Sequence, residues 1–495
     1  MKVLMVYPEY PATFWSFRYA LPFVNKRASL PPLGLLTVAS ILPKGWEKKL
    51  IDMNVEKLTD EDLSWADYVF ISGMIVQKKS AQEVIDRAKS SGKLVVAGGP
   101  LFTTGYKNFR NVDHFVLSEG ESTIPEFIKD LEDGKAKHIY TSSERPDIEK
   151  TPVPQWSLLK KEKYASLAIQ ISRGCPFNCE FCDVIIMNGR IPRLKTPGQI
   201  ITELNAVYES GWRGSVFIVD DNFIGNKVKV KAILEEISLW MKLKKKPFTL
   251  YAEASIDLAD DEKLMFLMQK SNFNSVFVGI ETPEAESLKF CGKMQNVNKD
   301  LGEKVKILQR HGFQVQGGFI LGFDTDTEKT FDNMIKFIQR SGIVTAMVGL
   351  LNALPNTKLY KRLQESGRIL KTASGNNTDF TLNFIPSMDK KLLIDGYRRV
   401  LNSIFSPENY YKRIVTFLKE YRRFAKETKL SFRLKVRALV RAVWKLGIRE
   451  KGKKYFWKMC FWTLIKKPNM LPEAISLAIY GYHYRIVMAD NYGKI

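Results

Sequence analysis

Cysteine and histidine are scarce in this chain, which has 5 and 4 of them among 495 residues. Three of the five cysteines fall within eight positions, so the chain lacks the paired cysteines of a disulfide-rich secreted protein. The apolar run at the N-terminus is too short for the core of a signal peptide, and no apolar run reaches the roughly 18 residues that span a bilayer. These absences predict a cytoplasmic protein without membrane-spanning segments.

Acidic residues are fewer than basic residues, and most of this difference lies in the C-terminal region. Lys and Arg outnumber Asp and Glu by 76 to 53, which gives a net charge of +23. Residues 411–495 hold 21 Lys and Arg against 5 Asp and Glu, so +16 lies in this stretch and +7 in the first 410 residues. Since 45% of the residues are apolar, a chain of this length can fill two or three cores. We expect several globular domains, of which the last is strongly basic.

The first 145 residues alternate short β-branched runs with helical stretches. Runs at 3–7, 49–54, 67–75 and 93–100 are separated by patterns such as 31–42 and 80–92, which predicts a Rossmann-like α/β domain with a parallel sheet. Ligands of such sheets bind beyond the carboxyl ends of the strands. Seven residues are expected there: Ser72, Gly73, Gly98, Gly99, Pro100, Glu119 and Gly120. Glycine at this edge lets a bulky ligand approach the backbone, although ordinary tight turns use glycine in the same way.

A second alternation runs from 165 to 372. Six β-branched runs, from SLAIQISRG (166–174) to TAMVGLLNALP (345–355), are separated by helical segments such as 261–272. This pattern predicts a partial (β/α)6 barrel, with a second open sheet as the alternative. In a barrel the chemistry lies at the carboxyl ends of the strands. The residues expected at that mouth are Asp220, Asp221, Asn222, Glu253, Glu281 and Gly322.

Three cysteines follow the first strand of this second alternation, in the pattern Cys-x-x-x-Cys-x-x-Cys at Cys175, Cys179 and Cys182. A cubane iron–sulfur cluster has four irons, so three thiolates leave one iron open to another ligand. A structural zinc ion needs a fourth protein ligand, and every histidine lies far away in the sequence. A zinc site and three incidental thiols are the alternatives, but three clustered ligands fit an iron–sulfur cluster better.

The cysteine motif, with Phe181 directly before its last cysteine, resembles that of the radical S-adenosylmethionine (SAM) superfamily. The resemblance implies a [4Fe–4S] cluster whose open iron binds SAM and whose reduced form cleaves SAM to methionine and a 5′-deoxyadenosyl radical. It places Phe181 against the SAM adenine. Further SAM-binding positions are implied at Asp220, Asp221 and Asn222, which replace a Gly-Gly-Glu sequence, and at Glu253, Glu281, Gly318 and Gly322.

The Rossmann-like domain before such a barrel resembles the cobalamin-binding domain of B12-dependent radical SAM enzymes. The resemblance makes Ser72, Gly73, Gly98, Gly99, Pro100, Glu119 and Gly120 cobalamin-binding candidates. The Asp-x-His-x-x-Gly signature that supplies a histidine to cobalt is absent, so what lies below the metal is open. The first 170 residues contain no cysteine, which argues against a methylthiotransferase with a second cluster.

The whole layout is similar to that of hopanoid C-2 methylases and related lipid-modifying radical SAM proteins. This resemblance implies a methyltransferase that acts on an unactivated carbon of a lipid-like or other hydrophobic substrate, with a [4Fe–4S] cluster, SAM and cobalamin as cofactors. It also implies an electron donor such as flavodoxin or ferredoxin. Two alternatives stay open: a radical cyclase or carbon–carbon bond-forming enzyme without net methyl transfer, and a non-catalytic cobalamin-binding sensor or carrier.

The expected domains are a B12-binding domain at 1–145, a linker at 146–164, a radical SAM barrel at 165–372 and a helical basic domain at 373–495. In 411–427 apolar residues share one helical face and basic residues take the rest, and 431–446 repeats this pattern. Such helices either lie on an anionic membrane, at the inner face of the cell membrane, or pack on the barrel with solvated basic faces. No nucleic acid is expected, because no RNA- or DNA-binding motif accompanies the charge.

Overall fold

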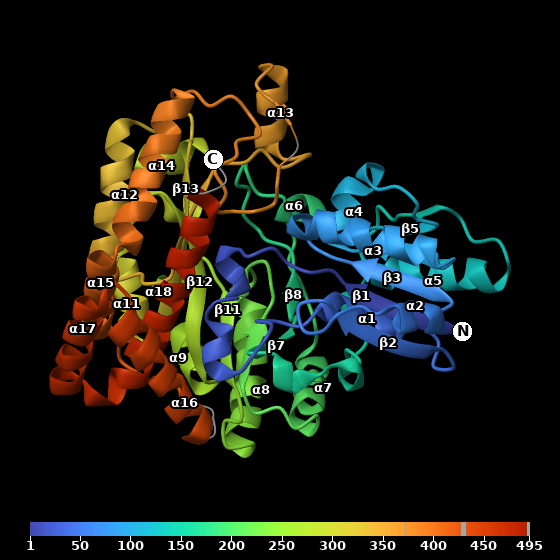
Figure 1. Ribbon diagram of the computed structural model, residues 1–495, viewed down its shortest axis with the longest axis horizontal. Coiled ribbons are helices and arrows are strands. Elements are labelled where there is room, and N and C mark those ends of the chain that lie inside the picture. Colours follow the sequence, from blue (N-terminus) through green and yellow to red (C-terminus); the bar gives the residue numbers. More distant parts are fainter. Residues whose placement is uncertain (372, 427–431, 493–495) are drawn as a thin grey trace. The chain divides into compact units, whose positions relative to one another are not determined.

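The computed structural model describes residues 1–371, 373–426 and 432–492 (Figure 1). They form two compact units. Unit 1 comprises residues 1–12, 27–169 and 193–212, and unit 2 comprises residues 13–26, 170–192 and 213–495. The chain thus enters each unit more than once, and the four linear domain ranges given above stay a prediction.

Unit 1 contains a six-stranded parallel sheet in the order β2-β1-β3-β4-β5-β6. Its strands are β1 (Lys2–Tyr7), β2 (Glu47–Asp52), β3 (Tyr68–Ser72), β4 (Leu94–Gly98), β5 (His114–Val116) and β6 (Ile139–Tyr140). Its helices are α1 (Leu33–Ile41), α2 (Asp60–Trp65), α3 (Lys78–Ser90), α4 (Pro100–Gly105), α5 (Gly120–Glu132) and α7 (Pro197–Glu209). This confirms the Rossmann-like α/β fold expected for the N-terminal region.

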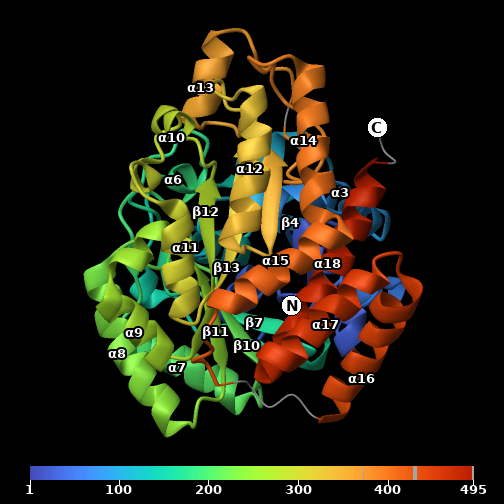
Figure 2. The ribbon, with the colours of Figure 1, turned by 90° about the vertical axis from the view of Figure 1, so that its left-hand side faces the viewer.

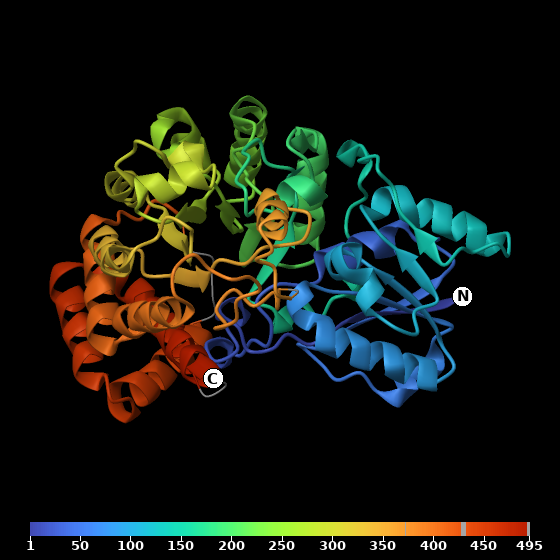
Figure 3. The same ribbon diagram turned by 90° about the horizontal axis from the view of Figure 1, so that it is seen from above.

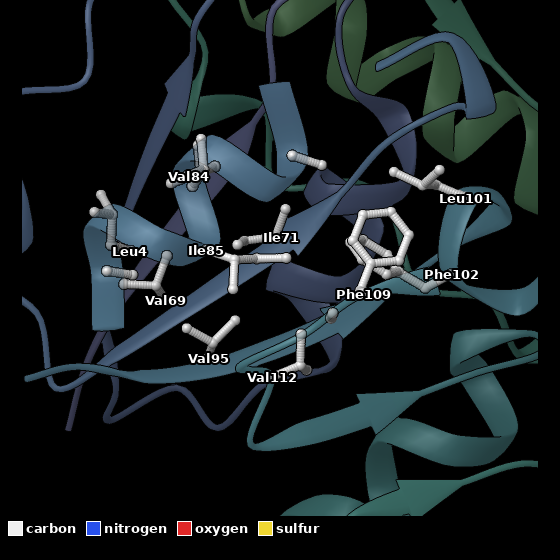
Figure 4. Close-up of a cluster of buried hydrophobic side chains, with 14 of the residues drawn as sticks. Leu4, Val69, Ile71, Val84, Ile85, Val95, Leu101, Phe102, Phe109 and Val112 are labelled. Atoms are coloured by element: carbon white, nitrogen blue, oxygen red, sulfur yellow. The ribbon is translucent and has the colours of Figure 1, made fainter. Parts of the chain in front are cut away.

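The core of unit 1 shows why the chain folds this way. Helix α3 buries a stripe of apolar side chains at spacings of three and four residues, while the strands bury continuous β-branched runs. Figure 4 shows Val84 and Ile85 of α3 beside Val69, Ile71 and Val95 of the strands. Helices cover both faces of a parallel sheet of this kind. Ligands therefore bind beyond the carboxyl ends of the strands.

Unit 2 contains five consecutive parallel strands in sequence order: β10 (Ser215–Ile218), β11 (Thr249–Glu253), β12 (Phe273–Glu281), β13 (Gln314–Leu321) and β14 (Ala346–Leu350). The helices that separate them are α8 (Lys227–Leu243), α9 (Glu262–Lys270), α10 (Ala285–Phe290), α11 (Leu301–Arg310) and α12 (Glu328–Ser341). In Figure 3 these helices form an arc around the strands. The strand before the cysteines, β7 (Ser166–Ile169), belongs to unit 1, whereas β8 (Ser172–Arg173) and α6 (Val184–Met187) belong to unit 2. The predicted α/β radical SAM architecture is confirmed.

The C-terminal region is helical, as expected. Its helices are α13 (Lys358–Glu365), α14 (Lys390–Phe405), α15 (Pro407–Glu420), α16 (Phe432–Ala442), α17 (Lys453–Lys466) and α18 (Leu471–Tyr492), and a π-helical segment (Val443–Arg449) joins α16 to α17. Figure 2 shows α15 and α17 side by side. Within the described residues, none of the helices is both long and apolar enough to cross a membrane.

Helix α15 decides between the two alternatives for its own part of the basic tail. Its apolar face, with Ile414, Phe417 and Leu418, is buried against α12 and α17, so this part of the tail packs on the protein. Arg413, expected on the solvated face, is fully buried and donates hydrogen bonds to the carbonyl oxygens of Ile404 and Val344. Burial lowers the pKa of its guanidinium to about 10.

Residues 13–26 leave unit 1 and lie against α18 within unit 2. The Phe14 ring stacks on Tyr484 with ring centroids 4.1 Å apart. His483 is buried, which lowers its pKa to about 4, so the ring is neutral at pH 7. Its Nδ1 accepts the N–H of Tyr19 at 3.4 Å, and its Nε2 lies 3.0 Å from the Phe14 carbonyl oxygen. The tautomer with the proton on Nε2 satisfies both contacts, so this segment is fixed rather than a free loop.

Candidate active site

The loop that carries the three cysteines lies wholly in unit 2, between residues 174 and 191. Cys179 is buried, and Cys175 and Cys182 are partly buried. Gly174 has a φ of 100°, and a Cβ there would lie 2.9 Å from the Gly189 carbonyl oxygen, which accepts the N–H of Cys175 at 3.1 Å. Glycine at this position lets the two ends of the loop lie close together, which fixes the position of Cys175.

Asp220 and Asp221, at the end of β10, hold this loop. The Asp220 carboxylate accepts the backbone N–H of Ile171 at 2.8 Å and the Ser172 hydroxyl at 2.7 Å. The Asp221 carboxylate accepts the N–H of Gly174 at 2.7 Å and the side-chain amide of Asn188 at 2.9 Å. These hydrogen bonds anchor residues 171–188 to the end of β10, and the SAM contacts expected at Asp220 and Asp221 stay a prediction. Burial raises the pKa of Asp220 to about 7.

Asn222 points toward the first cysteine. Its side-chain NH2 lies 3.9 Å from the Cys175 sulfur and 3.4 Å from the Ser255 hydroxyl. Its Oδ1 is buried and has no hydrogen-bond partner among the described residues. Since buried polar atoms are almost always satisfied, this amide oxygen is suited to a donor on a bound group.

Glu281 forms a buried ion pair with Lys293 at the end of β12, with 2.6 Å between Lys293 Nζ and Glu281 Oε1. The backbone of Glu281 is left-handed, with a φ of 65°, where β12 shifts register. A Cβ on Gly279 would overlap the Glu281 carboxylate, so a glycine is required beside the pair. Burial lowers the pKa of Lys293, but Glu281 and Cys179 raise it by more, so the ammonium stays charged. The pair therefore places a positive charge near the cysteine sulfurs.

The segment 291–296 covers the back of the cysteine loop, a contact between regions distant in sequence. The N–H of Glu180 donates to the Cys291 carbonyl oxygen at 2.9 Å, and Gln295 Nε2 lies 3.9 Å from the Cys179 sulfur. The Cys291 thiol itself turns to the Leu288 carbonyl oxygen of its own helix. Cys291 thus supports the loop with its backbone, while its thiol contacts its own helix.

Glu253 ends β11, and its backbone carbonyl oxygen accepts the N–H of Phe223 at 2.9 Å. Burial, together with the negative charges of Asp221 and Asp220, raises its pKa to about 8. The carboxyl is therefore mostly protonated at pH 7, and it can donate a hydrogen bond to a ligand as well as accept one.

The aromatic and glycine positions predicted for adenine lie at the end of β13. Phe181 packs against Phe323 with ring centroids 6.1 Å apart. Gly322 has a φ of 104°, and its N–H donates to Asp326 at 2.8 Å. A Cβ on Gly318 would lie 2.8 Å from the Phe277 ring. Asp326, whose pKa burial raises to about 6, was missed in the sequence because it lies past the glycines, in the following turn.

An ion-pair network ties the cysteine loop to α13. Arg362 donates to Glu180, the residue after Cys179, at 2.9 Å and to Asp324 at 2.7 Å. Asp324 also pairs with Arg368 at 2.7 Å and accepts the Ser387 hydroxyl at 2.7 Å. Burial raises the pKa of Asp324, but these donors lower it well below its ordinary value. Arg362 was missed in the sequence, because a charged residue on a helix is usually solvated.

These residues fit a [4Fe–4S] cluster. Within the described ranges, no three His, Cys, Asp or Glu side chains converge on one metal ion. A cubane needs no such convergence, because each cysteine binds a different iron. The thiols are protonated without metal, since burial raises the pKa of all three and that of Cys182 to about 12. Cluster binding would release these protons, and Lys293 would offset the resulting negative charge.

The predicted cobalamin edge of unit 1 is tightly packed at its glycines. Gly99 has a φ of 81°, and a Cβ there would overlap the Ser72 hydroxyl. A Cβ on Gly98 would lie 2.6 Å from the Val116 carbonyl oxygen of the neighbouring strand. Pro100 follows as the first residue of α4. The packing within unit 1 therefore favours glycine at both positions, independently of any ligand.

The other predicted residues of this edge have contacts of their own. A Cβ on Gly73 would lie 3.2 Å from the Gln77 side chain, and Gly120 begins α5. Glu119 forms a two-pronged ion pair with Arg193, at 2.7 and 3.2 Å. Its carboxylate is therefore engaged within unit 1.

A cluster of phenols lies near the ends of β1 and β2 in unit 1, with Tyr164 buried and Tyr7 and Tyr10 partly buried. The hydroxyls of Tyr7 and Tyr10 lie 2.5 Å apart. The Tyr164 hydroxyl donates to Asp52 at 2.8 Å, and Asn54 donates to the same carboxylate at 2.7 Å. Burial raises the pKa of Tyr10 to about 12, so the phenols stay protonated donors.

Two family models match the chain in chain order: the B12 binding domain over residues 24–128 and the radical SAM superfamily over residues 169–338. A model described as a domain of unknown function, DUF4070, matches residues 357–494. The hopanoid C-2 methylase of Rhodopseudomonas palustris is 34% identical over 505 residues, which is 99% of this chain and 93% of that protein. The chain belongs to the cobalamin-dependent radical SAM family. Its cofactors are a [4Fe–4S] cluster, SAM and cobalamin, and its class is that of the cobalamin-dependent radical SAM methyltransferases.

Other members of the family resemble the chain over its full length. An uncharacterised methyltransferase of Synechocystis sp. is 41% identical over 508 residues, covering 100% of this chain and 94% of that protein. The cobalamin-dependent radical SAM enzyme OxsB, solved with aqua-cobalamin, superposes with a TM-score of 0.65 at 14% identity, over 100% of this chain and 80% of that one. TsrM of Kitasatospora setae, solved with cobalamin and a [4Fe–4S] cluster, gives 0.61 at 13% identity, over 98% and 99%. These two likenesses show the shared fold.

Proposed function

We propose that this family member methylates an unactivated carbon of an apolar, lipid-like substrate. The observation that carries the proposal is an aromatic face on the strands of unit 2, formed by Phe217, Tyr251, Phe277 and Trp15 and partly exposed. Phe217 and Tyr251 are paired across β10 and β11 and stack at 4.7 Å. Tyr251 shares its face of β11 with Glu253, which is paired with Phe277 across to β12. An apolar ring or chain would be held there beside the proposed SAM site.

Trp15 extends the aromatic face from the segment that α18 fixes. Its ring meets Phe277 edge to face at 5.5 Å, and its indole N–H donates to the Met347 sulfur at 3.0 Å. Aromatic and thioether side chains bind apolar ligands well and exclude water. The relatives also fit, since they include the hopanoid C-2 methylase and a bacteriochlorophyllide d C-12(1)-methyltransferase of Chlorobaculum tepidum.

The residues around the cysteine loop would serve SAM. Cys175, Cys179 and Cys182 would hold the cluster, which supplies the electron that cleaves SAM when it is bound. Asn222 offers an unpartnered amide oxygen and Glu253 a protonated carboxyl. The amide oxygen can accept a hydrogen bond from the amino group or a hydroxyl group of SAM, and the carboxyl can donate one or accept one. Phe181 and Gly318 are the proposed adenine positions. A low-potential donor such as flavodoxin or ferredoxin would supply the electrons.

The test is an anaerobic assay of the reconstituted enzyme with SAM, cobalamin, a strong reductant and an unmethylated hopanoid as the probe. We expect a product heavier by one methylene unit, with S-adenosylhomocysteine and 5′-deoxyadenosine formed in equal amounts to it. Phe217→Ala should raise KM for the hopanoid about tenfold, whereas Phe266→Ala, on the exposed outer side of α9, should change nothing. A product of unchanged carbon number would favour the cyclase alternative, and failure of every apolar probe would overturn the substrate class.

We also propose that the protein works in the cytoplasm, in peripheral contact with the inner face of a membrane. Five free cysteines suit a reducing compartment. A lipid-like substrate resides in the bilayer, so an enzyme that docks there would meet it directly. The basic tail supports an anionic surface as the partner.

A further inference from the structure

Large apolar side chains are exposed along one stretch of unit 2, from α16 through the π-helical segment into α17. Nine of the 24 exposed large apolar side chains in the described part of the chain fall within residues 436–465. They are Val436, Leu439, Val440, Trp444, Ile448, Trp457, Phe461, Leu464 and Ile465. Such a concentration on a globular domain marks a contact surface.

These side chains form two rows. Val436, Val440, Trp444 and Ile448 follow each other at intervals of four residues, which places them along one side of the helical segment. Phe461 and Ile465 repeat the same interval from Trp457 on α17. Ile465 is 75% exposed and Phe461 60%, so no part of the described chain covers this row.

The two rows meet at Trp457. Its indole N–H donates to the Gly447 carbonyl oxygen at 2.9 Å, between Trp444 and Ile448 in the sequence. A Cβ on Gly447 would lie 3.0 Å from the Trp457 ring, so the glycine lets the indole lie against the backbone. Phe461 follows at 6.1 Å between ring centroids. Trp457 therefore joins the row on α17 to the segment that carries Trp444 and Ile448, and we call the nine exposed side chains together the aromatic-basic surface.

The charge around this surface is almost entirely positive. Residues 432–467 contain 12 Lys and Arg and one acid, Glu450. Lys453, Lys454 and Lys458 are exposed on α17 between the apolar positions. Glu450, the one acid, is neutralised by Arg485 at 2.7 Å. The exposed rim is thus free to meet negative charge.

We infer that the aromatic-basic surface docks on an anionic lipid bilayer, with Trp457 and Phe461 inserted at headgroup level and the lysines against lipid phosphates. Indole and phenyl rings flanked by lysines match that interface, because the rings enter the acyl boundary while the ammonium groups reach outward. A protein partner would call for fewer like charges at its centre. This inference gives the membrane contact of the proposed function a location, and it assigns that part of the domain of unknown function a docking role.

The experiment uses the full-length holoenzyme and two vesicle types, phosphatidylcholine alone and phosphatidylcholine with 30% phosphatidylglycerol. We expect flotation with the anionic vesicles and release at 1 M salt, because the Debye length falls from about 10 Å at 0.1 M to about 3 Å. Trp457→Ser with Phe461→Ser should weaken binding at least tenfold. Lys453→Glu with Lys454→Glu and Lys458→Glu should weaken it roughly 100-fold or more, at about 1 kcal/mol per charge.

Matched controls lie at the C-terminal end of α8, directly after it and on α9, away from this surface. Leu243→Ser with Phe266→Ser removes two exposed apolar side chains, and Lys242→Glu with Lys244→Glu and Lys245→Glu reverses three charges. Both should leave vesicle binding unchanged. Absence of binding to anionic vesicles, or a dimer in sedimentation that Phe461→Ser dissolves, would overturn the inference. SAM cleavage that persists in every variant separates this failure from failure of the proposed chemistry.

Discussion

Glu253 is a carboxyl group that the fold keeps protonated near neutral pH. Its folded pKa of about 8 lies above the ordinary 4.5, so the folded state binds more protons than the unfolded state between these values. The free energy of unfolding therefore falls as the pH rises from about 4.5 to about 8. A carboxyl whose pKa is shifted this far beside a proposed ligand site is a candidate functional position.

The prediction at this residue is that Glu253→Gln removes the pH dependence that Glu253 contributes. Each pKa unit corresponds to roughly 1.4 kcal/mol, so the cofactor-free variant should gain a few kcal/mol over the wild type at pH 8 and almost nothing at pH 5. Urea unfolding of both proteins at pH 5, 6.5 and 8 measures this. Asp220, whose pKa of about 7 adds dependence of the same sign, is present in both proteins. A difference that stays constant from pH 5 to 8 would show that Glu253 ionises normally.

At the scale of elements, α13 supports the cysteine loop through Arg362. The guanidinium joins Glu180 of the loop to Asp324 after β13, and the Leu359 N–H donates to the Glu180 carbonyl oxygen at 2.9 Å. A planar fork can bridge two carboxylates in fixed geometry, which a lysine cannot. The first helix of the domain of unknown function thus contacts the loop that carries the three cysteines.

We predict that Arg362→Lys keeps four irons per chain but loses them several times faster to a chelator, because Glu180 and its neighbour Cys179 gain freedom. The electron paramagnetic resonance signal of the reduced cluster should broaden as well. Arg340→Ala, an exposed position on α12, is the control and should match the wild type. If both variants lose iron at the same rate, the ion pairs of Arg362 do not stabilise the cluster and contribute little, as surface ion pairs usually do.

Periodicity predicted the strands and most helices, since β-branched runs and apolar stripes are local properties of the chain. It could not distinguish α15 from α16, because both repeat an apolar face and only the first finds a partner in α12 and α17. The cysteine spacing likewise identified the cluster loop. No local pattern shows that backbone and side-chain groups of residues 171–188 donate hydrogen bonds to the carboxylates of Asp220 and Asp221. Long-range partners of this kind depend on the fold.

At the scale of the whole molecule, the chain contributes to each unit from several segments, yet each proposed cofactor site lies within a single unit. The three cysteines with Asp221 and Lys293 belong to unit 2, and the edge with Ser72 and Gly99 belongs to unit 1. Each site is held by hydrogen bonds and close packing internal to its own unit. We therefore expect cluster binding and corrin binding to be independent in equilibrium.

The last prediction tests that independence. The triple variant Cys175→Ala, Cys179→Ala, Cys182→Ala should lose its iron and all SAM cleavage, because it removes every thiolate of the cluster loop. It should still take up about one hydroxocobalamin per chain, with the affinity of the wild type within a factor of about two. Iron analysis and the visible corrin spectrum after gel filtration give both values. Cys460→Ser, a buried position on α17, is the matched control and should keep both cofactors. Loss of corrin from the triple variant would mean that corrin binding depends on the cluster. The two binding equilibria would then be coupled rather than independent.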